Sequence, residues 1–191
     1  NAEDYSDWEP TSQNTAGSFR IPTGSIIKGA LQSAQQGIIW TDLDVWVQQY
    51  VGQPLVFSHN RVGSGCGLVG MHAAGIIGGD VYWMGPTNFF VLSSGGVKAI
   101  PCPVWNAAFQ NIDTSNLDKV RCAPNSLFNE ISWYIPLLGG TGENQLMIRL
   151  NIAEGEWDYS TQDRSAWTDV TVIGNPIGAD LEGYLYSHET G

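Results

Sequence analysis

The chain contains 191 residues, of which 42% are hydrophobic and 14% are charged. This composition excludes an intrinsically disordered protein and suffices for one domain with a substantial core. Nineteen acidic against eight basic residues give a formal net charge of −11, which argues against tight binding to a nucleic-acid backbone, because phosphate binding requires Lys and Arg.

Two complete β-hairpins are predicted in the first half of the chain. The first lies near 37–50, where the runs Ile38-Ile39-Trp40 and Val45-Trp46-Val47 are rich in the β-branched and aromatic residues that favour strands. The second lies near 80–97, DVYWMGPTNFFVLSSGGV, and places turn-forming residues between two runs. Both of its runs are almost wholly apolar, as expected for strands that are covered on both faces.

The pattern changes after the second hairpin. Pro103 can begin a helix, and the apolar residues that follow it recur with helical spacing: Val104, Trp105, Ala108, Phe109 and Ile112. We therefore expect one short helix near 103–112. A third hairpin follows near 130–159, and a partial one is expected at 183–191.

A repeat connects these hairpins. Aligned on their aromatic residues, Trp40, Trp83, Trp133 and Tyr186 are spaced 43, 50 and 53 residues apart. A repeat of this length, built from short strands and turns, is typical of β-propeller blades with about four strands each. The sequence thus predicts an all-β propeller segment over residues 1–191, with about three and a fraction blades. Because so few blades do not close a ring, either the segment belongs to a longer chain or blades of several copies complete one another, and the longer chain is the favoured interpretation.

Cysteine and glycine patterns give no strong sign of chemistry. Cys66, Cys102 and Cys122 have no paired C-x-x-C spacing, so they are interpreted as buried free thiols. The run from Gly65 to Gly70 matches G-x-G-x-x-G, yet no helical pattern follows it, and a turn between blades is favoured over a dinucleotide site. Cys66 with His59 or His72 would make a nucleophile and base, but a small buried core residue is the favoured interpretation of the Cys.

The acidic residues admit a second hypothesis. A glycosidase pair could be drawn from Asp42, Asp44, Glu154, Glu156, Asp158 and Asp163, although acids at hairpin turns more often cap backbone amides. Asp163 and Arg164 are interpreted as an ion pair at a blade edge. The scattered histidines show no metal-ligand spacing, so no catalytic, cofactor-binding or metal-binding residue is assigned, and no cofactor is expected.

Several short motifs together resemble the propeller of the tail nozzle proteins of short-tailed bacteriophages. These proteins are also called tail tubular, tail hub or DNA-stabilisation proteins. The resemblance covers nearly the whole chain and is carried by Asp7-Trp8-Glu9-Pro10, Ala16-Gly17-Ser18-Phe19, Ile39-Trp40-Thr41-Asp42, Tyr50-Val51-Gly52-Gln53-Pro54, Cys66-Gly67-Leu68, Val81-Tyr82-Trp83-Met84-Gly85, Asn88-Phe89-Phe90-Val91, Leu146–Asn151 with Gly155-Glu156-Trp157, Arg164-Ser165-Ala166-Trp167 and Tyr186-Ser187-His188-Glu189-Thr190-Gly191.

The resemblance implies a structural protein of the virion tail, made in the host cytoplasm and without enzymatic activity. Such proteins form a homo-oligomeric ring, a hexamer, below the portal and adaptor. They retain the packaged genome, dock fibres or spikes, and guide DNA out without binding its sequence. They are generally much longer than this sequence, which agrees with the incomplete blade count.

An alternative from another functional class is a propeller that binds or cleaves glycans at a cell surface. Mutation of one or two clustered acids should abolish turnover in such an enzyme, whereas a nozzle protein should show none. No apolar run approaches the roughly 20 residues that a membrane-spanning helix requires, so no membrane span is expected.

Overall fold

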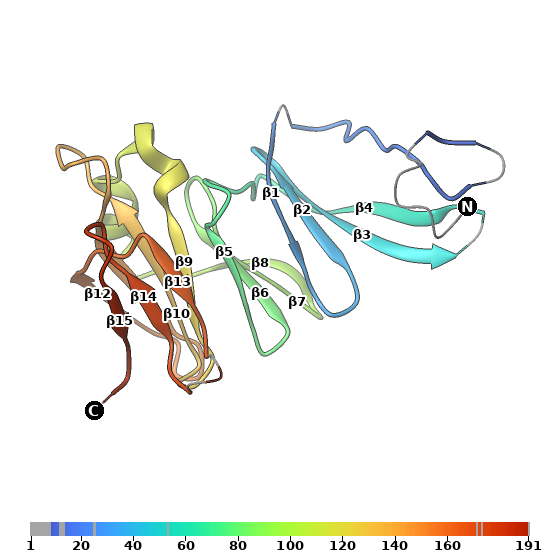
Figure 1. Ribbon diagram of the computed structural model, residues 1–191. Helices are drawn as coiled ribbons and strands as arrows, with labels where there is room; N and C mark the ends of the chain where they lie inside the picture. The colour runs from blue at the N-terminus through green and yellow to red at the C-terminus, as the bar shows by residue number, and fades with distance from the viewer. Residues whose placement is uncertain are drawn as a thin grey trace.

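The computed structural model describes residues 9–11, 14–24, 26–52, 54–170, 172 and 174–190. These residues form four antiparallel sheets, which confirms the predicted all-β class. Sheets 1 to 4 follow one another in chain order. In Figure 1 sheet 1 lies on the right, sheet 2 lies in the middle, and sheets 3 and 4 overlap on the left.

Each sheet is a meander in which every strand pairs with the next one in the sequence. Sheet 1 contains β1 (Ile27–Gln32), β2 (Gly37–Thr41), β3 (Asp44–Gly52) and β4 (Val56–Ser64). Sheet 2 contains β5 (Ala74–Ile77), β6 (Asp80–Met84), β7 (Phe89–Ser93) and β8 (Gly96–Ile100). Sheet 3 contains β9 (Arg121–Asn125), β10 (Glu130–Pro136), β11 (Asn144–Asn151) and β12 (Glu156–Thr161), and sheet 4 contains β13 (Ala166–Thr168), β14 (Ile177–Ala179) and β15 (Leu185–Ser187).

Local sequence explains the tight connections between strands. Gly78 and Gly79 join β5 to β6 with φ of 60° and 92°, the left-handed conformations that two-residue hairpin turns require. Asn151 and Gly155 hold the turn between β11 and β12, where the amide of Gly155 donates to the carbonyl of Asn151 over 2.8 Å.

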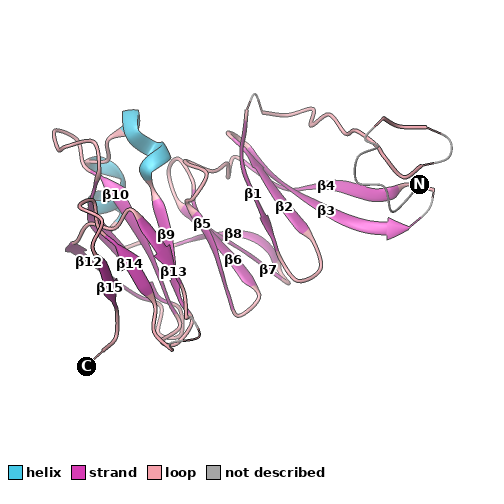
Figure 2. Cartoon of the chain, in the orientation of Figure 1, coloured by secondary structure: helices cyan, strands magenta, loops and turns pink. Residues whose placement is uncertain are grey.

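Two short helices lie between sheets 2 and 3 in the sequence (Figure 2). The first, a π-helix at Asn106–Gln110, confirms the helix expected near 103–112. The second, a 3₁₀-helix at Thr114–Lys119, was not predicted. It begins at Asp113, whose side chain accepts a hydrogen bond from the amide of Ser115, as N-terminal capping residues do.

Aromatic side chains pack the sheets face to face. Trp40 of sheet 1 and Trp83 of sheet 2 meet edge to face with ring centroids 5.6 Å apart. On the opposite face of sheet 2, Phe89 lies 4.5 Å from Trp133 of sheet 3. All four side chains are fully buried, so sheet 2 is covered on both faces, as its apolar strands predicted.

The structure corrects the predicted alignment of the repeats. Trp40 points toward the following sheet, whereas Trp83 and Trp133 point toward the preceding one. Side chains alternate between the two faces of a strand, so an alignment shifted by one residue exchanges the faces. Tyr186 does not align with the three tryptophans, because it lies on the third strand of sheet 4. The residue of the second strand that pairs with Tyr186 is Gly178.

The partial hairpin predicted at 183–191 is also wrong in extent. Sheet 4 begins at Ala166 and already contains three strands, with Trp167 in the first of them. Strands β13 and β14 have only three residues each, too few to show an alternating pattern in the sequence.

None of the helices in the described part of the chain has the length and apolar character needed to span a bilayer.

Replacing Trp133 with Ala should lower the free energy of unfolding by about 3–5 kcal/mol, because it opens a cavity between sheets 2 and 3. It also removes the 3.0 Å hydrogen bond from Trp133 Nε1 to the carbonyl of Ala73. Urea denaturation measures this loss. The control is Leu138→Ala, at a side chain that is 73% exposed, which should change stability by less than about 0.5 kcal/mol. Equal effects of the two changes would contradict the packing described.

Candidate functional site

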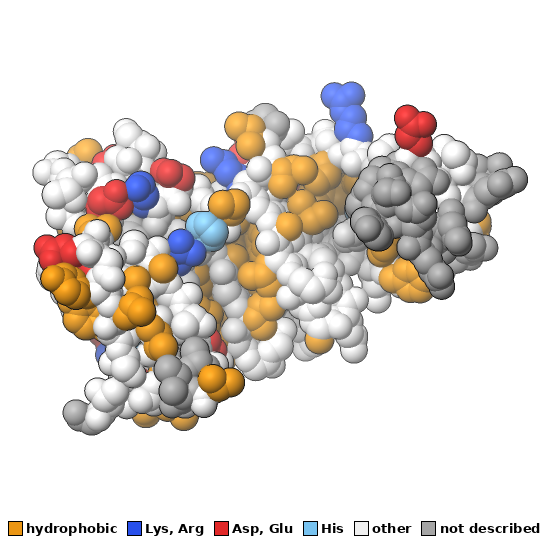
Figure 3. Space-filling model, in the orientation of Figure 1, with side chains coloured by type: hydrophobic (Ala, Val, Ile, Leu, Met, Phe, Trp, Pro, Cys, Tyr) orange, Lys and Arg blue, Asp and Glu red, His pale blue; other side chains and the backbone are white. Residues whose placement is uncertain are grey.

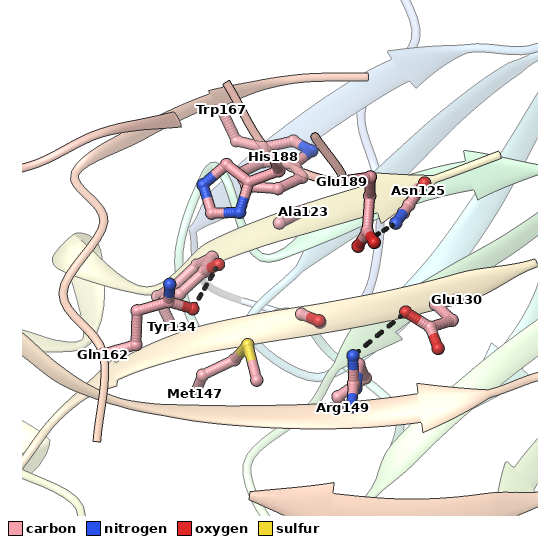
Figure 4. Close-up of a pocket in the computed structure, with 11 residues that line it drawn as sticks. Ala123, Asn125, Glu130, Tyr134, Met147, Arg149, Gln162, Trp167, His188 and Glu189 are labelled. Carbon is pink, nitrogen blue, oxygen red and sulfur yellow. Dashed lines mark hydrogen bonds and ion pairs between the residues drawn. The ribbon is translucent and has the colours of Figure 1, made fainter. Parts of the chain in front are cut away.

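The contact between sheets 3 and 4 differs from the other two contacts because it is largely polar. One face of sheet 3 carries Ile131, Trp133 and Ile148 toward sheet 2, all fully buried. The opposite face borders a cavity of about 210 Å³ against sheet 4 (Figure 4). The cavity is lined by Ala123, Asn125, Glu130, Ser132, Tyr134, Met147, Arg149, Gln162, Trp167, His188 and Glu189.

Arg149 organises the charges on the sheet 3 side of the cavity. Its Nη2 lies 2.6 Å from Asp158 Oδ2, and its Nη1 lies 3.2 Å from Glu130 Oε2. The hydrogen bond to Asp158 raises the pKa of Arg149. Burial raises the pKa of Glu130 and outweighs the opposing effect of Arg149, and Glu189 adds to the rise. The cluster therefore holds more negative than positive charge.

The segment after β15 closes the sheet 4 side of the cavity. The Nε2 atom of His188 accepts a hydrogen bond from Arg164 Nε over 3.1 Å, and its ring lies 4.6 Å from that of Trp167. Glu189 Oε1 accepts from Asn125 Nδ2 of β9 over 3.2 Å. These contacts attach the C-terminal segment to both sheets.

Arg164 fills the space that Gly178 leaves open. A Cβ at position 178 would lie 2.8 Å from Arg164 Cδ, and the guanidinium carbon lies 4.4 Å from the ring centre of Tyr186. Arg164 is only 7% exposed, and its Nη1 lies 3.6 Å from Asp163 Oδ1. The predicted ion pair is thus present, but Arg164 also forms part of the contact between the sheets.

The glycine run has the structural role that the sequence favoured. It lies in the connection between β4 and β5, in extended and bent chain without a following helix. A Cβ at Gly67 would lie 2.3 Å from the carbonyl oxygen of Asp42, and one at Gly70 would lie 2.3 Å from that of Leu117. Close backbone approach therefore explains these two glycines.

The hypothetical cysteine nucleophile lies in the core. Cys66 is buried, and burial raises the pKa of its thiol to about 11. The ring of His59 stacks on Phe19 at 4.3 Å and contacts Gln48. Burial lowers the pKa of His72. The prediction of free thiols is confirmed for all three cysteines, although Cys102 is only half-buried.

The acids considered for a glycosidase fall into two separate groups. Asp42 and Asp44 lie at the turn of sheet 1, and the other four lie in and after the β11–β12 hairpin of sheet 3. Burial raises the pKa of Asp44, but hydrogen bonds, the first from Thr23, outweigh it and lower the pKa overall. Because sheet 2 separates the two groups, the structure does not bring them together. The described residues contain no cluster of three or more His, Cys, Asp or Glu arranged to hold a metal ion.

The cavity residues were not identified from the sequence. One signal was present, because Arg149 is a charged residue at a half-buried position within the apolar run Leu146–Leu150. A half-buried charge there indicates an acidic partner nearby. Its partners lie on other strands, so spacing along the chain does not reveal them.

Neither a family model nor a curated protein matches this chain.

The stability of the protein should fall in weak acid in a way that depends on His188. Burial, aided by Arg164, lowers the pKa of His188 below its usual 6.5. Its contribution to stability is therefore complete above that value and is lost as the pH falls through the lowered pKa. His188→Gln retains an acceptor for Arg164 but does not titrate, so its melting temperature should fall less than that of wild type between about pH 8 and about pH 5. The control is His59→Gln, a change at another histidine, whose melting temperature is measured at the same two pH values. Equal pH dependence of wild type and His188→Gln would contradict the assignment.

Cys66 and Cys122 should resist alkylation in the folded protein, because the thiolate is the reactive form and burial raises the pKa of both thiols. Intact mass measured after iodoacetamide treatment at about pH 7.5 tests this. All three cysteines should react in urea. Rapid modification of Cys66 without urea would show a reactive thiol.

Proposed function

We propose that this chain is a β-propeller segment and a non-catalytic structural component of the tail nozzle of a short-tailed bacteriophage. The observation that carries the proposal is the succession of four antiparallel meanders packed face to face. Propeller blades have this construction. The nozzle assignment rests on the sequence motifs that resemble that family.

The contacts between sheets support the blade interpretation. Strand β5 contacts β9, and β9 contacts β13, so the first strands of sheets 2, 3 and 4 lie beside one another. Last strands also meet, since β4 contacts β8. In a propeller the first strands of successive blades line the centre and the last strands form the rim.

The charge distribution suits a protein that lets DNA pass without holding it. Residues 121–190 contain ten carboxylates against three arginines, and acidic side chains gather over sheets 3 and 4 in Figure 3. Carboxylates repel phosphates, so DNA leaving through a passage that they line would not adhere to its wall. As in the nozzles that the chain resembles, we propose a ring of six copies that contacts the adaptor and the fibres or spikes.

The proposal predicts that this polypeptide is part of the virion tail. Mass spectrometry of purified particles from the source culture should find its peptides, and an antibody against it should label the tail in electron micrographs. Particles that lack the protein should lose packaged DNA, because the nozzle retains it.

Two results would overturn the proposal. One is the absence of these peptides from purified particles that contain the other tail proteins. The other is hydrolysis of cell-surface glycans by the purified protein that Glu154→Gln or Glu156→Gln abolishes.

A further inference from the structure

We infer that the free edge of β15 (Leu185–Ser187) binds an antiparallel strand of another polypeptide, one with an apolar centre and basic residues at its ends. This inference goes beyond the proposed tail function and does not depend on it. It rests on the repeated plan of the four sheets, the hydrogen-bonding groups of the edge and the charges on either side of it.

Sheet 4 has one strand fewer than the other three sheets. In sheets 1 to 3 the third strand lies between the second strand and a fourth one, whereas β15, the third strand of sheet 4, pairs only with β14 in the described part of the chain. The third strands β3, β7 and β11 each contain several buried residues, but every residue of β15 is exposed. The position that a fourth strand occupies in the other sheets is therefore open in sheet 4.

The backbone of β15 offers unpaired hydrogen-bonding groups on this edge. The carbonyl of Tyr184 accepts a hydrogen bond from the amide of Asp180 over 3.1 Å, and the amide of His188 donates to the carbonyl just before β14 over 2.9 Å. Tyr184 and His188 thus direct their backbone groups toward β14. Because successive residues of an antiparallel strand alternate in this direction, Leu185 and Ser187 direct their N–H and C=O groups away from β14, where a further strand can bond them.

The edge lacks the features that protect exposed edge strands from pairing. Natural proteins protect such edges with Lys, Pro or a β-bulge. The run Tyr184-Leu185-Tyr186-Ser187 contains neither Lys nor Pro, and β15 pairs with β14 in unbroken register. The side chains of Tyr184 and Leu185 are 61% and 74% exposed. Because exposed apolar surface and unpaired backbone groups occur together here, the edge has the properties of a binding site for a strand.

The course of the chain after β15 favours a strand from another polypeptide. In sheets 1 to 3 the fourth strand follows the third after two to four residues. His188 instead extends the pairing with β14, and Glu189 reaches Asn125 of sheet 3. Figure 1 shows that the chain leaves β15 without reversing its direction. The residues after β15 therefore do not form the tight turn that delivers a fourth strand in the other sheets.

The charges beside the edge select the chemistry of the partner. Glu182 precedes β15 and Glu189 follows it, and both are exposed. Two copies of β15 paired antiparallel would bring Glu182 of one copy near Glu189 of the other, because the two residues lie at similar distances from the middle of the strand. Like charges opposite each other destabilise a sheet, so a second copy fits poorly. Basic residues at both ends of a partner strand would instead meet both carboxylates, and apolar residues at its centre would cover Leu185.

The test uses the capped peptide acetyl-Lys-Thr-Thr-Val-Leu-Val-Thr-Lys-amide and the same peptide with Glu in place of both Lys. Binding to the folded chain is measured by NMR. The lysine peptide should bind with a dissociation constant below about 5 mM, and the glutamate peptide should bind at least about tenfold more weakly. The lysine peptide should slow hydrogen exchange at the amides of Leu185 and Ser187, which the new strand bonds. It should affect Tyr186 less, because that amide already faces β14.

Variants locate the site. Leu185→Pro removes an outward N–H without removing a hydrogen bond to β14, so it should weaken binding of the lysine peptide at least about tenfold. Leu185→Ala keeps the N–H and should weaken binding less. Glu182→Gln should weaken binding by about threefold. The matched control is Glu154→Gln, an exposed carboxylate at the β11–β12 turn, which should bind like wild type. Melting curves show which variants fold, and the exchange of the two amides in the wild-type chain tests the site without any variant.

Several results would overturn the inference. They are failure of the lysine peptide to bind at about 10 mM, equal binding of the two peptides, and slowed exchange confined to strands other than β15. Light scattering gives a further one. If the chain alone forms a dimer that Leu185→Pro converts to a monomer, a second copy occupies the edge in place of the basic partner.

Discussion

The packing of large aromatic side chains between facing sheets is the interaction on which the rest of the structure depends. An isolated hairpin is barely stable in water, and here each hairpin gains stability from the next sheet. Trp40 meets Trp83 across one contact, and Phe89 meets Trp133 across the next. Trp83 and Trp133 also donate their indole N–H groups to the carbonyls of Cys66 and Ala73, so these contacts fix the connections as well as the sheets.

The contact between sheets 3 and 4 follows another physical principle. Charged and polar groups replace most of the aromatic packing, and they must be paired because burial makes an isolated charge costly. Arg149 and Arg164 each satisfy several partners. Asn144 Nδ2 of β11 donates to the carbonyls of Lys119 and Arg164, joining sheet 3 to the 3₁₀-helix and to the segment that leads into sheet 4. This contact is thus specific in geometry, yet it leaves a cavity with excess negative charge.

These two kinds of contact suggest a division of roles within the proposed propeller segment. The apolar contacts of sheets 1 to 3 provide a rigid body. The polar contact holds sheet 4 and the C-terminal segment against sheet 3 through hydrogen bonds and charged pairs.

The sequence alone determined the all-β class, the hairpins near 37–50 and 80–97, and the helix near 103–112, because these depend on local runs, turn residues and spacing. It did not determine which face each tryptophan occupies, since a shift of one residue exchanges the faces. Nor did it reveal β13 and β14, the first two strands of sheet 4, which have three residues each. Only the tertiary structure decided the cavity, because Asn125, Arg149 and Glu189 come from segments far apart in the chain. These residues border one cavity only because the folding of sheets 3 and 4 brings their segments together.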